Sequence, residues 1–275
     1  MVLLPAATQD FLIRELSPQE RLYYSLLNKE SYEIVSSFNR RAFRIEKVLW
    51  PYFDHNEIDE FRMIQCHTGT LISGSTALQF FDLTVYESSD LDLYVDTEHC
   101  SFLGEFLLRI GYQFQPFIHQ RQEFHTALAE IISDDMDDSE LRIGRLMDEV
   151  FGEGFGDYDV HGINTVFNFV RNGRTIQVVV ARMCAMDVIL AFHSTCVMNI
   201  ISHSHAYSLY PRATFIDRVS SKNFKIYRLE IQKEAAREKY RQRGWELINV
   251  PPLPWLCVGS LNSLTRDALA IPPVG

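Results

Sequence analysis

The spacing of apolar residues predicts a helical start to the chain. Residues 8–28 and 30–50 are each expected to form a helix. In the first range, Ser17 followed by Pro18 and Glu20 has the pattern of a helix N-cap with a proline in the first turn. In the second range, the apolar residues that recur at helical spacing are Phe38, Ala42, Phe43, Ile45, Val48 and Leu49.

The middle of the chain alternates between strand and helix patterns. In residues 91–95, Leu91, Leu93 and Val95 alternate with polar residues, as expected of a strand with one buried face. The other predicted strands are 70–73, 166–170 and 175–180, the last two joined as a hairpin by Asn172-Gly173. Further helices are predicted at 76–81, 102–110, 120–132, 185–202 and 229–243, and a polar link at 54–60.

These elements predict an α+β fold in three parts. A helical N-terminal lead (residues 1–60) precedes a central domain (61–205) that contains an acidic segment (123–160), and a basic, helical and proline-rich extension (206–275) follows. The composition, with 47% hydrophobic and 23% charged residues, is typical of a globular protein and excludes a disordered or collagen-like chain.

The formal charge of −10 is concentrated in one segment of the chain. The acidic segment contains twelve acids and two bases, a sum of −10, so the rest of the chain is neutral. Residues 212–243 carry a local charge of +6. The average charge argues against nonspecific coating of nucleic acid, but its location weakens that exclusion. We interpret the acidic segment as a lid, a self-masking segment or a site for a basic partner.

Cysteine usage and hydropathy bear on the compartment. Five cysteines without a CxxC pair favour a reducing environment. The most apolar window, residues 184–202, is interrupted by polar residues, so no membrane partner is expected, and the N-terminus lacks a signal-peptide pattern. A cytoplasmic or nuclear protein is predicted.

Two short motifs carry candidate chemistry. Gly74-Ser75 stands between a predicted strand and a predicted helix, where backbone N–H groups and a hydroxyl can hold a phosphate. On the next strand, Asp90 and Asp92 share a face because side chains alternate along a strand. Two adjacent carboxylates repel each other, and a hard cation such as Mg²⁺ (or Mn²⁺) relieves that repulsion.

This order of motifs resembles the DNA polymerase beta-type nucleotidyltransferase superfamily. The resemblance implies a mixed β-sheet flanked by helices, a nucleoside triphosphate bound by Gly74 and Ser75, and a divalent metal bound by the catalytic pair Asp90 and Asp92. It also implies transfer of a nucleoside monophosphate to an RNA, protein or small-molecule acceptor. Residues 38–49, 72–95 and 187–212 further resemble a fungal branch of this superfamily.

The resemblance also implies a third carboxylate on a later strand. Gln177 occupies that position here, and a neutral amide is neither a base nor a strong magnesium ligand. Asp157 or Asp159 could substitute. Whether the chain is an enzyme is therefore left open, and the alternative is a catalytically degenerate nucleotidyltransferase-like module that acts in protein interaction.

Aromatic and basic residues near position 210 are further nucleotide-binding candidates. Tyr207, Tyr210 and Arg212 could stack on a base or hold a phosphate. A packed turn around Pro211 explains the same pattern equally well.

Overall fold

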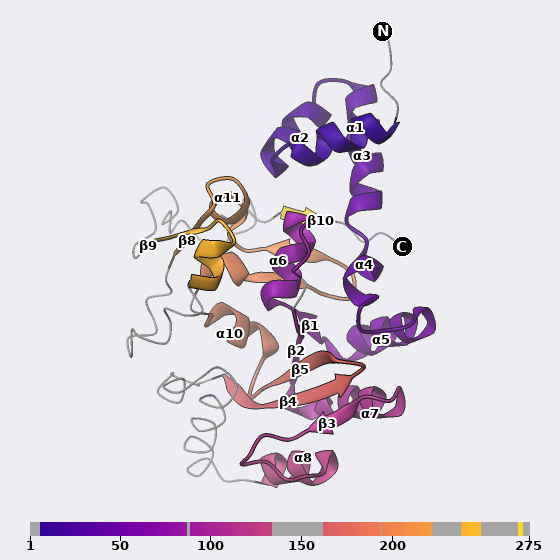
Figure 1. Ribbon diagram of the computed structural model, residues 1–275, viewed down its shortest axis with the longest axis vertical. Helices are drawn as coiled ribbons and strands as arrows, with labels where there is room; N and C mark the ends of the chain where they lie inside the picture. Colours follow the sequence, from indigo (N-terminus) through magenta and orange to yellow (C-terminus); the bar gives the residue numbers. More distant parts are fainter. Residues whose placement is uncertain are drawn as a thin grey trace.

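The fold combines a mixed β-sheet with flanking helices (Figure 1). The structure, a computed structural model of the 275-residue chain, describes residues 6–86, 89–133, 162–192, 194–221, 238–248 and 269–271. The sheet and its helical cover confirm the predicted α+β class. Most of the acidic segment, including Asp157 and Asp159, and the prolines of the tail lie outside the described residues.

Helices form the N-terminal lead and the cover of the sheet. Their bounds are α1 (Ala6–Glu15), α2 (Pro18–Ser25), α3 (Lys29–Ala42), α4 (Ile45–Leu49), α5 (His55–Thr68), α6 (Gly74–Asp82), α7 (Cys100–Arg109), α8 (Phe124–Ser133), α10 (Ala185–Leu190) and α11 (Pro211–Phe215). Two short 3₁₀ turns are η1 (Thr97–His99) and η3 (Thr195–Val197).

Within the described residues, eight strands form the main sheet in the order β10-β7-β6-β1-β2-β5-β4-β3. Their bounds are β1 (Leu71–Ile72), β2 (Leu91–Asp96), β3 (Gln113–Gln115), β4 (Ile163–Arg171), β5 (Arg174–Ala181), β6 (Asn199–Ile201), β7 (Ala206–Ser208) and β10 (Leu269–Ile271). Among these neighbours β2 and β5 are parallel and the others antiparallel, while β8 (Val219–Ser221) and β9 (Glu246–Ile248) form a separate parallel pair.

The two faces of β2 contribute to different parts of the core. Leu91, Leu93 and Val95 are completely buried in the larger cluster, which includes side chains of α5 and α7. Tyr94, on the opposite face, packs with α10 in a smaller cluster. The same face carries the Asp92 side chain, so the carboxylate lies beyond the end of this smaller core.

Several helix boundaries correct the predictions. The range 8–28 is two helices, because Ser17 accepts from the Glu20 N–H (3.2 Å) and starts α2. The range 30–50 breaks at Phe43, whose ring packs against Phe80 in the core. The predicted link 54–60 is wrong: Asp54 and Glu57 form a capping box that starts α5.

The C-terminal half brings one further correction. The predicted helix 185–202 ends at Leu190, and its second half forms β6, where Ile201 pairs with Ile72 of β1. Of the predicted helix 229–243, the structure describes the end: residues 238–242 are helical, and Gly244 leaves the helix with a φ of +95°. The predicted hairpin is confirmed, with Asn172 and Gly173 both at positive φ.

Candidate functional site

The junction between β1 and α6 is held by hydrogen bonds of Ser73. Ser73 leaves β1 with its N–H donated to the Asp92 carbonyl oxygen (3.3 Å) and its hydroxyl donated to the Asn199 carbonyl oxygen (2.6 Å). Gly74 then starts α6 with a φ of +66°, which residues with a Cβ rarely adopt. Ser73, at the N-cap position, makes no side-chain cap, so its side chain leaves the first N–H groups at the positive end of the helix dipole unsatisfied.

The Asp92 carboxylate lies directly against Gly74. A Cβ on Gly74 would overlap Asp92 Oδ2 and come within 3.4 Å of its Cγ. Ser75, the next residue, is buried, and the hydroxyl of Thr76 donates to the Asp90 carbonyl oxygen (2.9 Å). The structure therefore brings the Gly-Ser motif and both aspartates into one cluster.

Burial raises the pKa of both carboxylates. Desolvation, and then the negative charge of Asp90, raises the pKa of Asp92 to about 7. Partial desolvation also raises the pKa of Asp90, although a hydrogen bond from Thr175 acts in the opposite direction. A carboxyl group with a pKa near 7 is only half ionised at neutral pH. Positive charge placed between the two groups would favour the ionised form of both.

Lys239 brings one such charge from the C-terminal part of the chain. Its ammonium lowers the pKa of both aspartates. Desolvation and the nearby Arg243 lower the pKa of Lys239 itself, while Asp92 and Asp90 raise it. Lys239 is therefore close enough to interact electrostatically with both carboxylates.

Arg243, four residues after Lys239, brings a second cation near Lys239 and lowers its pKa. Its guanidinium lies 3.7 Å from the centroid of the Tyr86 ring, a cation–π contact. Its Nη1 atom is buried and has no hydrogen-bond partner among the described residues. The segment is fixed by buried Tyr240 and Trp245, and Trp245 Nε1 donates to the Thr214 carbonyl oxygen (2.9 Å). A buried guanidinium nitrogen without a partner is suited to accept an anionic ligand.

Gln177 stands beside Asp92, at the position predicted for the third carboxylate. In the parallel pair β2·β5, Asp92 is in register with Gln177, and in β4·β5 Gln177 is in register with Asn168. All three side chains therefore share one face of the sheet. Asn168 Oδ1 is buried without a hydrogen-bond partner in the described part of the chain. The row next to Asp92 thus consists of amides.

Within the described residues, the candidate metal ligands of this cluster are the two aspartates. No group of three or more His, Cys, Asp or Glu side chains suited to a metal occurs within the residues the structure describes. Asp157 and Asp159, the predicted substitutes, lie outside those residues. What the cluster offers is one carboxylate pair, two amides and two cations.

The residues near position 210 lie on another part of the sheet. Tyr207 belongs to β7, which is separated from β2 by β6 and β1. Tyr210 precedes α11, and Arg212 forms an ion pair with Asp217 (3.5 Å). The structure does not bring Tyr207, Tyr210 or Arg212 together with the aspartates, and nucleotide binding by these residues stays a prediction.

Lys239 and Arg243 are the site residues that the sequence did not single out. They belong to the basic run 212–243, in which charges of both signs alternate. The available signal was the apolar pair Tyr240 and Trp245 within that run, since a buried anchor shows which side of a charged helix faces the protein.

Comparison of the chain with protein-family models, curated protein sequences and solved structures finds no match. In the described ranges, no helix has the length and apolar character needed to span a membrane.

Proposed function

We propose that this chain binds a nucleoside triphosphate together with a divalent cation at the junction of α6 and β2, in a nucleotidyltransferase-like fold. The contact between Gly74 and the Asp92 carboxylate carries the proposal. It means that the start of α6 and the carboxylate pair form one surface. A triphosphate on the helix N-terminus would then lie next to a cation on Asp90 and Asp92.

The carboxylate pair fits Mg²⁺ or Mn²⁺. Magnesium is usually held by one or two protein carboxylates together with the phosphates of the substrate, and Asp90 and Asp92 would supply these carboxylates. The raised pKa of Asp92 is the corresponding electrostatic observation, because a cation would relieve the repulsion that contributes to it. When bound, the cation neutralises phosphate charge and supports attack at phosphorus.

The remaining residues of the cluster suit the rest of the triphosphate. Ser75 and the first N–H groups of α6 would donate hydrogen bonds to phosphate oxygens. Lys239 and Arg243 would contribute positive charge. The unpartnered Nη1 of Arg243 would gain a hydrogen-bond acceptor from the triphosphate. Arg243 and Lys239 therefore extend the predicted site.

The reaction we propose for this site is transfer of a nucleoside monophosphate. The acceptor hydroxyl oxygen forms a bond to the α-phosphorus while the bond from the α-phosphorus to the β-phosphate oxygen breaks. Pyrophosphate leaves with the bonding electrons, and the hydroxyl proton passes to Asp90 or to water. Asp90, which is exposed, is the carboxylate of the pair that an acceptor can reach.

A thermal-shift experiment tests the binding step. Each of the four ribonucleoside triphosphates with MgCl₂ is added to the full chain, and the melting temperature is measured. A nucleotide at about one hundred times its Kd should stabilise the chain by about 2.7 kcal/mol, or a rise of roughly 5 °C for a domain of this size. The double variant Asp90→Asn/Asp92→Asn should lose this rise.

A matched control separates the carboxylate pair from general charge. Asp59→Asn/Glu105→Gln removes two exposed carboxylates from α5 and α7, away from the cluster, and should keep the full rise. The proposal is wrong if none of the four nucleotides raises the melting temperature of the wild-type chain, or if the two double variants respond alike.

A second candidate function is nucleotide binding without transfer, in a degenerate module that serves protein interaction. This second function is favoured by Gln177, which lies beside Asp92 where another carboxylate is expected, and by Asn168 on the next strand. The two functions differ in turnover and not in binding, so a carboxylate introduced at position 177 separates them.

A further inference from the structure

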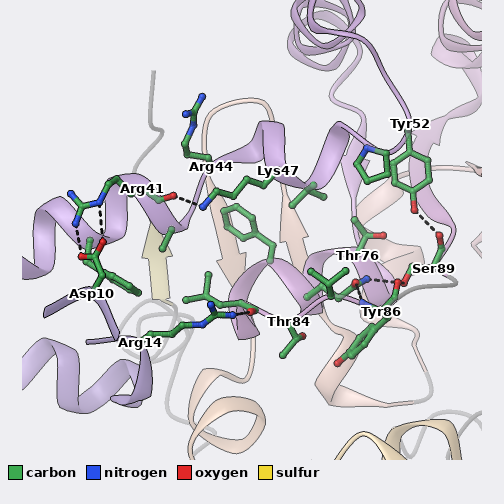
Figure 2. A pocket seen from close by; sticks show the side chains of 18 of the residues that line it. Asp10, Arg14, Arg41, Arg44, Lys47, Tyr52, Thr76, Thr84, Tyr86 and Ser89 are labelled. Carbon is green, nitrogen blue, oxygen red and sulfur yellow. Dashed lines mark hydrogen bonds and ion pairs between the residues drawn. The ribbon is translucent and has the colours of Figure 1, made fainter. Parts of the chain in front are cut away.

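A pocket of about 760 Å³ lies between the N-terminal helices and α6 (Figure 2). Its walls come from α1, α3, α4 and α6 and from residues 83–86 and Ser89, which precede β2. We call it the basic pocket after the charged residues that line it: Arg14, Arg41, Arg44, Lys47, Arg174 and Asp10. Its volume is in the range of pockets that hold small ligands or the end of a larger one.

The charge of the basic pocket is opposite to that of the chain. Its described lining carries five cations and one anion, a net +4, whereas the chain carries −10. Arg41 is neutralised by Asp10 through bonds of 2.5 and 3.3 Å, and Arg44 by Glu46 (3.2 Å), which lies outside the lining. Arg14 donates to the Leu83 carbonyl oxygen (2.8 Å) and Lys47 to the Arg41 carbonyl oxygen (2.6 Å). A carbonyl satisfies a donor without cancelling its charge, so Arg14 and Lys47 keep a full positive charge for an anion.

Aromatic rings accompany these cations. Phe11, on the same helix as Arg14, is 65% exposed although it is a large apolar side chain. Tyr86 and Tyr52 line the pocket farther along, but Tyr52 is buried and Arg243 covers the Tyr86 ring, so Phe11 is the exposed ring of the described lining. Cations that follow a phosphate backbone, together with rings on which bases stack, are the pattern of single-stranded nucleic-acid sites. An acidic peptide would match the charge as well, and the experiment below uses one as a competitor.

One end of the basic pocket lies next to the backbone of Asp90. Thr76 and Ser89 line it, and Thr76 also donates to the Asp90 carbonyl oxygen (2.9 Å). Figure 2 shows Tyr52 at the same end, where its hydroxyl donates to the Ser89 carbonyl oxygen (2.6 Å). Arg174, also in the lining, directly precedes Thr175, which hydrogen-bonds to Asp90. A ligand that fills the pocket would thus end beside Asp90.

We propose that the basic pocket holds the end of a single-stranded nucleic acid, with phosphates on Arg14 and Lys47, a base against Phe11 and the terminal hydroxyl beside Asp90. Binding of the strand follows from the pocket alone. Its part as acceptor of the transferred nucleoside monophosphate rests on the proposed function. The acceptor of that reaction is then a nucleic-acid strand and not a protein.

Fluorescence anisotropy with a labelled ten-nucleotide oligouridylate tests the binding on the full chain. The variant Arg14→Gln/Lys47→Gln removes two phosphate contacts, and the control Lys29→Gln/Arg40→Gln removes two exposed charges of α3 outside the pocket. Two lost contacts should reduce the slope of log K against log salt by about 1.4 and weaken binding about twentyfold at 0.1 M salt. The control should bind as the wild type does.

A second variant covers the case in which the charge variant is poorly folded. Phe11→Ser removes an exposed ring, so it should leave the melting temperature nearly unchanged and weaken binding at least about fivefold. Equal binding by wild type, pocket variant and α3 control would overturn the proposal. The proposal would also be overturned if a ten-residue polyglutamate displaced the probe as efficiently as unlabelled oligouridylate does. The pocket would then recognise charge alone.

The nucleotide experiment distinguishes this failure from failure of the proposed function. Arg14→Gln/Lys47→Gln should keep the melting-temperature rise caused by nucleoside triphosphate and MgCl₂, while Asp90→Asn/Asp92→Asn should lose it and still bind the oligouridylate. No oligouridylate binding with an intact nucleotide response refutes the pocket inference alone. Oligouridylate binding without any nucleotide response supports the pocket and refutes the proposed function.

Discussion

Replacing Gly74 with alanine tests the geometry from which the function is inferred. Two separate costs are expected. A residue with a Cβ at a φ of +66° costs about 1 to 2 kcal/mol. The new methyl group also overlaps the Asp92 carboxylate, and forced overlap in a packed site costs typically another 1 to 3 kcal/mol. The free energy of unfolding should therefore fall by about 2 to 5 kcal/mol.

Gly69 is a natural control for the backbone cost. It ends α5 at a φ of +67°, almost the same as that of Gly74, and a Cβ there has no atom within 4 Å. Gly69→Ala should therefore cost about 1 to 2 kcal/mol. The difference between the two variants measures the contact with Asp92.

Urea unfolding followed by tryptophan fluorescence, to which buried Trp245 contributes, gives the free energy of unfolding of both glycine variants. The double variant Gly74→Ala/Asp92→Ala removes the overlapping carboxylate, so it should recover about 1 to 3 kcal/mol relative to the sum of the single variants. Gly74→Ala should also abolish the nucleotide-dependent rise in melting temperature, whereas Gly69→Ala should keep it. If both glycine variants lose equal stability and keep the nucleotide response, Gly74 does not lie against a functional carboxylate and the reasoning fails.

Two further predictions concern the carboxylates of the cluster. Asp92 has its pKa raised from 3.8 to about 7, so the folded chain binds this proton more tightly than the unfolded chain; the resulting stabilisation is complete below pH 4 and is lost as the pH rises to about 7. Urea unfolding between pH 4.5 and 8 should show a loss of up to about 4 kcal/mol in the wild type. Asp92→Asn should lack this loss. Parallel curves of unfolding free energy against pH for the two chains would contradict the prediction. Gln177→Asp should raise transfer of α-³²P-labelled nucleotide at least about tenfold, while Asn168→Asp, one strand farther from Asp92, should not. Equal activity of these two variants and the wild type, with nucleotide still bound, would show that a missing carboxylate is not what limits transfer.

The sequence predicted those elements whose signals are local. Leu91 and Leu93 are completely buried, as their alternation with aspartates indicated. Asn172 and Gly173 adopt φ values of +51° and +73°, the conformation that such a pair favours in a two-residue hairpin. In both cases the neighbours in sequence are also the neighbours in space.

The failures lie where partners distant in sequence decide the structure. Residues 185–202 are mostly apolar with a few polar interruptions, so their pattern fits a buried helix as well as a buried strand. The second half becomes β6 because β1 and β7 supply strand partners on both sides. One failure has a local cause instead. The range 54–60 is predicted as a link, although Asp54 and Glu57 have the spacing of a capping box that starts a helix.

The candidate site shows the same division. Gly74 and Asp92 are close in sequence, and a strand-helix-strand unit was enough to bring them together. Lys239 and Arg243 come from the far end of the chain, and their charges alone do not distinguish them from the other bases of their run. The distinguishing information is the burial of Tyr240 and Trp245, which depends on the finished core.

Local charge also separates the two proposed sites. The carboxylate cluster combines Asp90 and Asp92 with Lys239 and Arg243, and its formal charges cancel. A triphosphate gains little from long-range attraction there and depends on short contacts, which salt screens weakly. The basic pocket carries +4 and attracts a polyanion at a distance, so its binding must weaken steeply with salt. Nucleotide and strand should accordingly differ in salt dependence even though their sites meet at Asp90.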